Sequence, residues 1–129
     1  MSETQPRANL RMCVAATFPA LLLACTRMPE PGLHVHSGDA RRGATRLAQL
    51  ECGACHVIPG IPGAVGRVGP ALAAYAQRSY VAGKFPNEPE TLVRFMLDPP
   101  AMAPLTAMPA VRMTDQDARD IAAYLYELD

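Results

Sequence analysis

The residues best suited to chemistry are two cysteines and a histidine in the pentapeptide Cys-Gly-Ala-Cys-His at positions 52–56. Two thiols three positions apart on one tight turn can each form a thioether bond to one of the two vinyl groups of a haem. The residue after the second thiol then projects toward the iron. The spacing therefore predicts that Cys52 and Cys55 hold one haem c covalently and that His56 is an axial ligand of its iron.

Three other interpretations of this pentapeptide agree less well with the rest of the chain. A structural zinc site needs four ligands, and the further candidates, His34 and His36, lie in a proline-flanked stretch without a second Cys-x-x-Cys pair. A thioredoxin-like redox pair needs a βαβ setting, whereas the sequence is helical before the motif and rich in proline and glycine after it. A disulfide between Cys52 and Cys55 is the third alternative.

The other two cysteines lie in an N-terminal segment with the pattern of an export signal. Arg7 and Arg11 precede a thirteen-residue apolar run at 12–24, which contains Cys13 and ends in a small residue before Cys25. This order is typical of a secretory signal peptide, and the run is shorter than the about 20 apolar residues that cross a bilayer. We therefore expect residues 1–24 to be a signal peptide, cleaved before Cys25, and the mature chain to be exported to the periplasm.

The end of this segment, Leu-Leu-Ala-Cys, resembles the lipobox of bacterial lipoproteins, in which the cysteine becomes the lipidated first residue. Leu23 departs from the pattern, because a small residue usually stands there. The resemblance implies that a lipid on Cys25 anchors the mature protein to a membrane surface. The alternatives are cleavage without lipidation and an uncleaved anchor. Residues 25–36 contain two prolines and a glycine and are expected to be a linker.

Length and charge limit the fold and the function. The 129 residues allow one small domain beyond the leader. Lys plus Arg and Asp plus Glu both count 12, and loss of Glu3, Arg7 and Arg11 with the leader leaves 10 basic and 11 acidic side chains. A nearly neutral chain lacks the basic surface that neutralises phosphates, so we expect no nucleic-acid partner. The absence of tryptophan leaves a core that a cofactor would have to fill.

Helices are predicted on both sides of the pentapeptide, and no segment alternates like a strand. Asp39 or Ser37 can cap a helix at 40–50, which leads directly into the motif. A loop rich in proline and glycine follows at 57–68, and a short helix is expected at 71–80.

Two further helices are predicted in the second half of the chain. Asn87 is expected to cap a helix that Pro89 starts and Pro99 ends. The proline-containing stretch at 101–111 should be irregular. Thr114 then caps a final helix, whose apolar residues recur at helical spacing.

The order of helix, Cys-x-x-Cys-His, Gly-Pro loop, short helices, Met-Pro loop and terminal amphipathic helix resembles the class I c-type cytochrome family, over residues 37–129. The resemblance implies an all-α domain of about four to five short helices and loops around one covalent haem. It also implies that the first and last helices cross where Gly43 meets Tyr124. A carbonyl beside the Gly-Pro pair accepts from the histidine in that family, so Pro70 would orient His56.

The second axial ligand decides whether the iron moves electrons or binds small molecules. Met108 precedes Pro109 and stands six residues before the expected cap of the last helix, as the ligand does in the resembling family. The resemblance therefore implies that Met108 is the second ligand. Met102, in the same irregular stretch, is the alternative, and Met96 and Met113 are expected to pack in the core.

A haem with histidine and methionine ligands would carry one electron at a time, so neither an enzyme activity nor a small-molecule substrate is expected. The alternatives are ligation by His34 or His36, and an open iron position as in a haem sensor or a peroxidase-like protein. We expect an apolar pocket around the haem, formed by Val57, Leu72, Leu92 and Leu105.

Electron transfer implies redox partners such as oxidase or dehydrogenase subunits. The chain would be a mobile carrier or a fixed haem c subunit of a larger complex. The last helix is acidic, whereas the first half of the domain carries the basic residues Arg41, Arg42, Arg46, Arg67, Arg78 and Lys84. A basic set around the haem edge would steer an acidic partner, and the alternative is that these residues are solvated helix faces.

Overall fold

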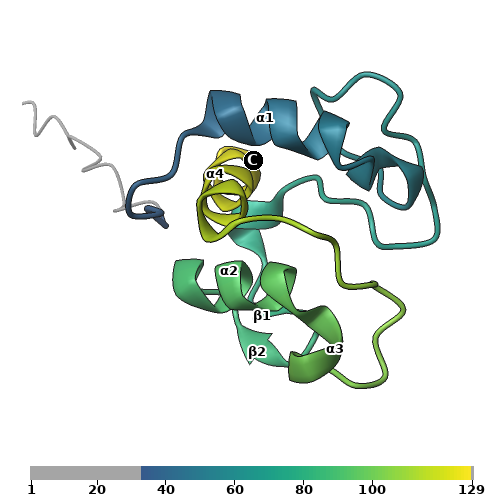
Figure 1. The fold of residues 1–129 in the computed structure, drawn as a ribbon, viewed down its shortest axis with the longest axis vertical. Coiled ribbons are helices and arrows are strands. Elements are labelled where there is room, and N and C mark those ends of the chain that lie inside the picture. The colour runs from purple at the N-terminus through teal and green to yellow at the C-terminus, as the bar shows by residue number, and fades with distance from the viewer. Residues whose placement is uncertain (1–32, 129) are drawn as a thin grey trace, which may run out of the picture.

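The computed structural model describes residues 33–128, so the expected signal peptide, Cys25 and most of the expected linker lie outside the described residues. Figure 1 shows a mostly helical chain in which α4 lies between α1 and α2. The predicted all-α class is confirmed. The elements are α1 (Ala40–Gln49), η1 (Cys52–Ala54), η2 (Tyr75–Gln77), β1 (Tyr80–Val81), β2 (Phe85–Pro86), α2 (Pro89–Leu97), α3 (Pro99–Met102) and α4 (Asp115–Tyr126).

The predicted caps of the first and last helices are confirmed. Asp39 accepts a hydrogen bond from the amide of Arg42 at the start of α1. At the start of α4, Thr114 accepts from the amide of Asp117, whose carboxylate accepts in turn from the amide of Thr114. This capping box satisfies two amides that would otherwise lack partners, which explains why the helix starts at this point.

The crossing of α1 and α4 depends on Gly43. A Cβ atom at this position would collide with the carbonyl oxygen of Asp120, so only glycine lets the two backbones approach this closely. A close crossing at Gly43 was predicted, but its nearest neighbours are backbone atoms of Asp120 and Ile121. Tyr124 instead donates its hydroxyl proton to the carbonyl of Pro59 at 2.6 Å and fastens the loop after the pentapeptide.

Ion pairs join the same two helices. Nε of Arg42 lies 2.8 Å from the carboxylate of Asp120, whose side chain is 3% exposed. Nε of Arg46 lies 2.8 Å from the carboxylate of Asp117. Basic and acidic residues that are far apart in the sequence therefore meet in the fold, and part of the charge that the first half carries is neutralised there.

The segment before α2 differs from its prediction. The helix expected at 71–80 is a single 3₁₀ turn, η2, and the antiparallel pair β1 and β2 follows where no strand was expected. Asn87 does not cap α2, because Glu88 occupies the cap position. The side-chain amide of Asn87 instead donates to the carbonyls of Tyr75 and Arg78, at 3.2 and 3.0 Å. This buried side chain thereby ties the η2 turn to the hairpin.

The stretch between α2 and α4 begins with the short helix α3, where part of an irregular stretch was expected. Asp98 caps it by accepting from the amide of Ala101, so the irregular backbone begins at Ala103 rather than at position 101. The two prolines at its start are compatible with a first helical turn, in which the amides lack intrahelical partners anyway.

The hydrophobic core includes a residue before position 37, where the domain was expected to begin. Val35, which lies in the expected linker, is 3% exposed and belongs to the same apolar cluster as Leu47 and Ile121. None of the helices within residues 33–128 is long and apolar enough to cross a bilayer.

Candidate functional site

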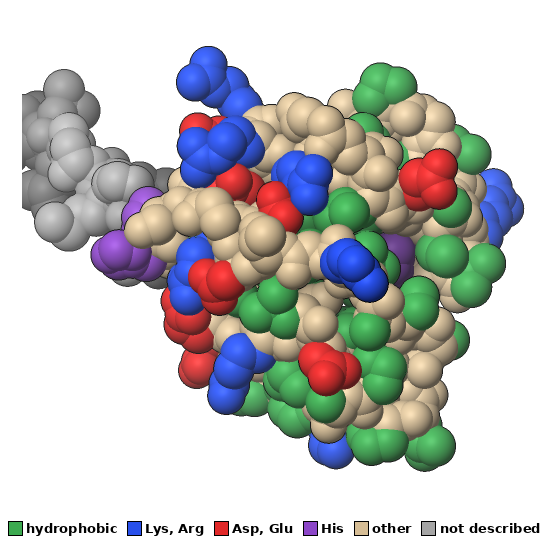
Figure 2. All heavy atoms as spheres, viewed as in Figure 1, with side chains coloured by type: hydrophobic (Ala, Val, Ile, Leu, Met, Phe, Trp, Pro, Cys, Tyr) green, Lys and Arg blue, Asp and Glu red, His purple; other side chains and the backbone are tan. Residues whose placement is uncertain are grey.

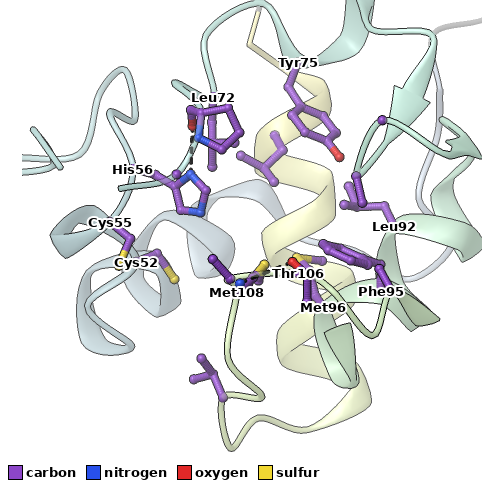
Figure 3. Close-up of a pocket in the computed structure, with 18 of the residues that line it drawn as sticks. Cys52, Cys55, His56, Leu72, Tyr75, Leu92, Phe95, Met96, Thr106 and Met108 are labelled. Carbon is purple, nitrogen blue, oxygen red and sulfur yellow. Dashed lines mark hydrogen bonds between the residues drawn. The ribbon is translucent and has the colours of Figure 1, made fainter. Parts of the chain in front are cut away.

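A cavity of about 940 Å³ lies between the pentapeptide, the hairpin, α2 and the loop that leads into α4. Its volume is in the range of about 300–1,000 Å³ that is usual for ligand pockets. Figure 3 shows Cys52, Cys55 and His56 at one side of it and Leu92 and Phe95 at the other. The cavity therefore brings together segments that are separated by about half of the described chain.

Cys52 and Cys55 lie at the edge of the cavity on the turn η1, half-buried and with free thiols. The amide of His56 closes the turn by donating to the carbonyl of Cys52 at 3.0 Å. A side chain on Gly53 would collide with Ala64, so the glycine lets the following loop pack onto the turn. Burial raises the pKa of the Cys52 thiol, which keeps it in the protonated form at neutral pH.

His56 is fixed by the segment that follows the loop. Its Nδ1 lies 2.7 Å from the carbonyl oxygen of Pro70. Because a carbonyl only accepts, Nδ1 carries the proton and the lone pair of Nε2 is available to a metal ion. A Cβ atom on Gly69 would collide with the imidazole ring, so the glycine makes room for the ring at this position. Pro70 thus contacts His56 as the family resemblance implies.

Met108 lines the cavity from the loop before α4, and Figure 3 shows it across the cavity from His56. Its amide lies 3.2 Å from Oγ1 of Thr106, which accepts the hydrogen bond and shapes the loop. The alternative, Met102, ends α3 and is not among the residues that line the cavity. The geometry therefore favours Met108 as the thioether that faces the histidine.

The remaining candidate ligands have other surroundings. Met96 is 5% exposed, and Met113 packs against the same core, as expected. Both also line the cavity, which the sequence did not indicate. His34 and His36 are exposed and do not line the cavity.

The apolar wall agrees with its prediction in part. Leu72 and Leu92 are buried and line the cavity, whereas Leu105 lines it with a fully exposed side chain. Val57 does not line it; its carbonyl accepts instead from the amide of Leu72 at 2.8 Å. Sequence reasoning missed Phe95, although it stands three positions after Leu92 and hence on the same face of α2. It also missed Tyr75, because a single 3₁₀ turn has no periodic pattern to reveal its buried side.

Two cationic side chains, Arg78 and Lys84, line the cavity, and no carboxylate of residues 33–128 does. The other four residues of the basic set lie elsewhere, and two of them, Arg42 and Arg46, form the ion pairs with α4. In Figure 2 most charged side chains gather on one side of the molecule, and hydrophobic ones on the opposite side. The basic set as a whole therefore does not surround the cavity.

These groups fit a haem c. A free imidazole nitrogen, a thioether sulfur and two thiols around one apolar cavity are the donors that hold such a group. The two cations match the two carboxylates at its periphery.

Comparisons with known proteins agree with this geometry. The family model described as Cytochrome c matches residues 40–129. The chain is 30% identical over 90 residues to cytochrome c oxidase subunit 2 of Alkalihalophilus pseudofirmus, a match that covers 69% of this chain and 25% of that relative. The chain thus spans about a quarter of the relative's length. The structure of cytochrome c2 from Rhodobacter sphaeroides has a TM-score of 0.52 and 24% identity, over 70% of this chain and 96% of that one.

Proposed function

Because the chain belongs to the cytochrome c family, whose domains transfer electrons and hold haem c covalently, we propose a specific arrangement for it. Residues 37–129 are a class I domain in which Cys52 and Cys55 hold one haem and His56 and Met108 are its axial ligands. The observation that carries this proposal is the meeting of all four side chains at one apolar cavity.

The two cysteines attach the group without any change in oxidation state. Cys52 and Cys55 would hold a haem by thioether bonds, in which each sulfur would take one carbon of a vinyl group and the thiol proton the other carbon. The protonated thiol that burial favours at Cys52 already holds this proton. The turn η1 presents both cysteines at the same edge of the cavity.

The ligands and the wall determine which redox state is favoured. When bound, the haem supplies an iron that alternates between the ferric and ferrous states by one electron. The Pro70 carbonyl fixes the tautomer of His56 and makes Nε2 more basic. Met108 favours the ferrous state more than a second histidine would. Leu72, Leu92 and the other apolar residues exclude water, which also disfavours the more highly charged ferric state.

The partners are redox proteins, such as an oxidase or a dehydrogenase subunit. The similarity to an oxidase subunit supports an oxidase as the acceptor, and it equally suits a fixed haem c subunit of a larger complex. Purification of the tagged full chain from membranes decides between these roles. A mobile carrier is recovered alone, whereas a fixed subunit is recovered with stoichiometric partners.

Export and lipidation complete the proposal. Residues 1–24 are removed as a signal peptide and Cys25 carries the lipid that holds the domain at the periplasmic membrane surface. Mass spectrometry of the mature N-terminus tests this directly. A Cys25→Ser variant should leave the membrane fraction for the soluble periplasm, and retention of this variant in the membrane would contradict lipid anchoring.

The haem arrangement is tested by expressing the full chain with a haem-attachment system. Under denaturing conditions the wild type should have the added mass of one haem, and a Cys52→Ala/Cys55→Ala variant should not. The reduced wild type should not bind carbon monoxide, because both axial positions are filled. Wild-type protein without covalent haem would contradict the proposal, and rapid carbon monoxide binding would favour a sensor or peroxidase-like role.

A further inference from the structure

Tyr75 is a buried side chain whose hydroxyl group the proposed ligand set does not use. The side chain is 5% exposed and lines the cavity. Figure 3 shows the hydroxyl directed into the cavity. Within residues 33–128 the backbone carbonyl of Tyr75 accepts from Asn87, whereas the hydroxyl forms no hydrogen bond. Because the hydroxyl faces the cavity, it is free to donate to an acceptor that the occupant of the cavity brings.

The ring of Tyr75 is held rigidly by a cluster behind it. Tyr126 packs edge-on, with the ring centroids 5.9 Å apart, and the guanidinium of Arg78 lies over the ring, 4.9 Å from its centroid. The hydroxyl of Tyr126 donates to Oδ1 of Asn87 at 2.9 Å. The amide of Asn87 donates to the carbonyl of Tyr75 at 3.2 Å. These contacts fix where the free hydroxyl points.

The backbone that turns this ring inward is strained. Ala74 has φ of 49° and ψ of 39°, a left-handed conformation that residues with a side chain seldom adopt. Such strain persists where the surrounding structure enforces it, and it is frequent at ligand-binding sites. The turn at Ala74 thus sets the direction of the ring, and the free hydroxyl is the group that can contact an occupant of the cavity.

The chemistry of the cavity identifies the acceptor. The charged residues that line it, Arg78 and Lys84, are both cationic, so the cavity suits a bound group that carries carboxylates. A haem carries two propionate carboxylates at the edge remote from its vinyl groups. Tyr75 likewise lies on the side of the cavity away from Cys52 and Cys55. We propose that the Tyr75 hydroxyl donates a hydrogen bond to one haem propionate, an inference that rests on the haem binding proposed above.

This contact makes Tyr75 a positioning residue that also tunes the redox potential. Burial raises the pKa of Tyr75 to about 12, against the opposing effect of Arg78, so the phenol remains a donor at every physiological pH. A donor to a carboxylate draws negative charge away from the iron. Without the donor, the propionate keeps more of its negative charge, and this charge stabilises the ferric iron. The reduction potential should therefore fall.

The contact can be observed directly in the wild-type holoprotein. In the diamagnetic ferrous state, proton NMR should show a slowly exchanging Tyr75 hydroxyl proton with nuclear Overhauser contacts to the propionate methylene protons. A hydroxyl proton that exchanges rapidly with water, or that contacts the Met108 methyl group instead, would overturn the proposal. This measurement needs no variant and does not depend on folding of a mutant.

A matched pair of variants tests the consequence. Tyr75→Phe should lower the reduction potential and shift the propionate carboxylate band in redox-difference infrared spectra. Tyr124→Phe removes a hydroxyl from a tyrosine that does not line the cavity and that bonds the carbonyl of Pro59 instead, and it should change neither quantity. If the wild type carries covalent haem and Tyr75→Phe has the same reduction potential and the same carboxylate band, this inference fails and the proposed function stands. If the wild type carries no covalent haem, the inference and the proposed function both fail.

Discussion

His56 has little freedom, because one neighbour bonds its ring and another leaves space for it. The Pro70 carbonyl accepts from Nδ1 at 2.7 Å, and Gly69 lies against the ring where any side chain would collide. The Gly-Pro pair therefore has two different tasks: the glycine provides space and the proline provides the acceptor. Neither task is visible in the residue types alone.

Gly69→Ala should displace the imidazole ring and weaken its bond to Pro70. Loss of this bond makes Nε2 less basic, so the ferric state loses more stabilisation than the ferrous state. The reduction potential should rise by about 60 mV for each tenfold change in relative affinity, as for any one-electron couple. Protein-film voltammetry measures it.

Gly63→Ala is the control, because no atom lies within 4 Å of a Cβ at that position. Its φ of 74° makes alanine unfavourable there, so the variant should be less stable by about 1 kcal/mol. Its reduction potential should nevertheless equal that of the wild type. Equal potentials for Gly69→Ala and the wild type would contradict the role assigned to the glycine.

The pair α1 and α4 is the element on which the site is built. α1 leads into the cysteine turn, and α4 follows the loop that contains Met108, so their crossing sets the relative position of the two proposed axial ligands. Gly43 provides the close approach and Asp120 provides the main polar anchor. The carboxylate of Asp120 accepts from Arg42, from Gln116 and from the amide of Asp39.

Asp120→Asn should destabilise the fold by about 1.5–3 kcal/mol at neutral pH, because it removes charge-assisted hydrogen bonds from a buried position. The hydrogen bond from Arg42 holds the pKa of Asp120 below its ordinary value. A lowered pKa contributes stability that is complete above the unfolded-state value of about 3.9 and is lost as pH falls through the folded-state value. The difference between variant and wild type should therefore shrink below about pH 4.

Urea denaturation at several pH values measures this difference. Asp115→Asn is the control on the same helix, because its carboxylate is 60% exposed where it meets Arg119. That variant should lower the free energy of unfolding by less than about 1 kcal/mol at any pH. If the loss of stability in Asp120→Asn stays constant down to pH 3, the carboxylate does not act through its charge.

The sequence indicated those elements that depend on local signals. Asp39 and Thr114 have the side chains that cap helices, and the apolar spacing after Thr114 gives the buried face of α4. The two-residue strands are too short to show an alternation, so the hairpin could not be found. Asn87 has the chemistry of a cap, but its tertiary bonds to the η2 turn outweighed that local preference.

The residues of the site could likewise be predicted only where a local signal exists. The spacing of Cys52, Cys55 and His56 is set by chemistry within one turn, so the sequence alone predicts these three residues. Met108 required a family resemblance, since nothing local separates it from Met102. Tyr75 could not be found, because its burial results from a strained turn and from contacts across the fold.

Across the whole molecule, pairing between helices removes much of the charge asymmetry of the sequence. Arg42 and Arg46 meet the acidic residues of α4, and Arg119 is bonded to Glu90 and Asp115. Among residues 33–128, the unpaired positive charge at the cavity is limited to Arg78 and Lys84. Long-range steering of an acidic partner should be correspondingly weak.

Lys84 provides a direct test of this electrostatic account. Oxidation of the reduced holoprotein by anionic hexacyanoferrate(III) should slow as ionic strength rises, because Lys84 is exposed at the cavity. Lys84→Gln should flatten this dependence and lower the rate at low salt by less than about tenfold. Arg41→Gln, an exposed change away from the cavity, is the control in stopped-flow measurements. Equal salt dependence in both variants would contradict the account.

Stability of the whole domain should depend on the haem. Without it, the helices would surround a cavity of about 940 Å³, whereas interiors of small domains are close-packed. The Cys52→Ala/Cys55→Ala variant, prepared without haem, should show no cooperative thermal transition by circular dichroism. A sharp, native-like transition in this variant would show that the protein core is sufficient by itself.

The central claim is that His56 and Met108 bind the haem iron together, and the optical spectrum of the oxidised holoprotein tests it most directly. The wild type should show a weak sulfur-to-iron charge-transfer band, which Met108→Ala abolishes and Met102→Ala retains. The reduced Met108→Ala protein should also bind carbon monoxide, unlike the wild type. If the band survives in Met108→Ala, or is lost in Met102→Ala, the assignment of the second ligand is wrong.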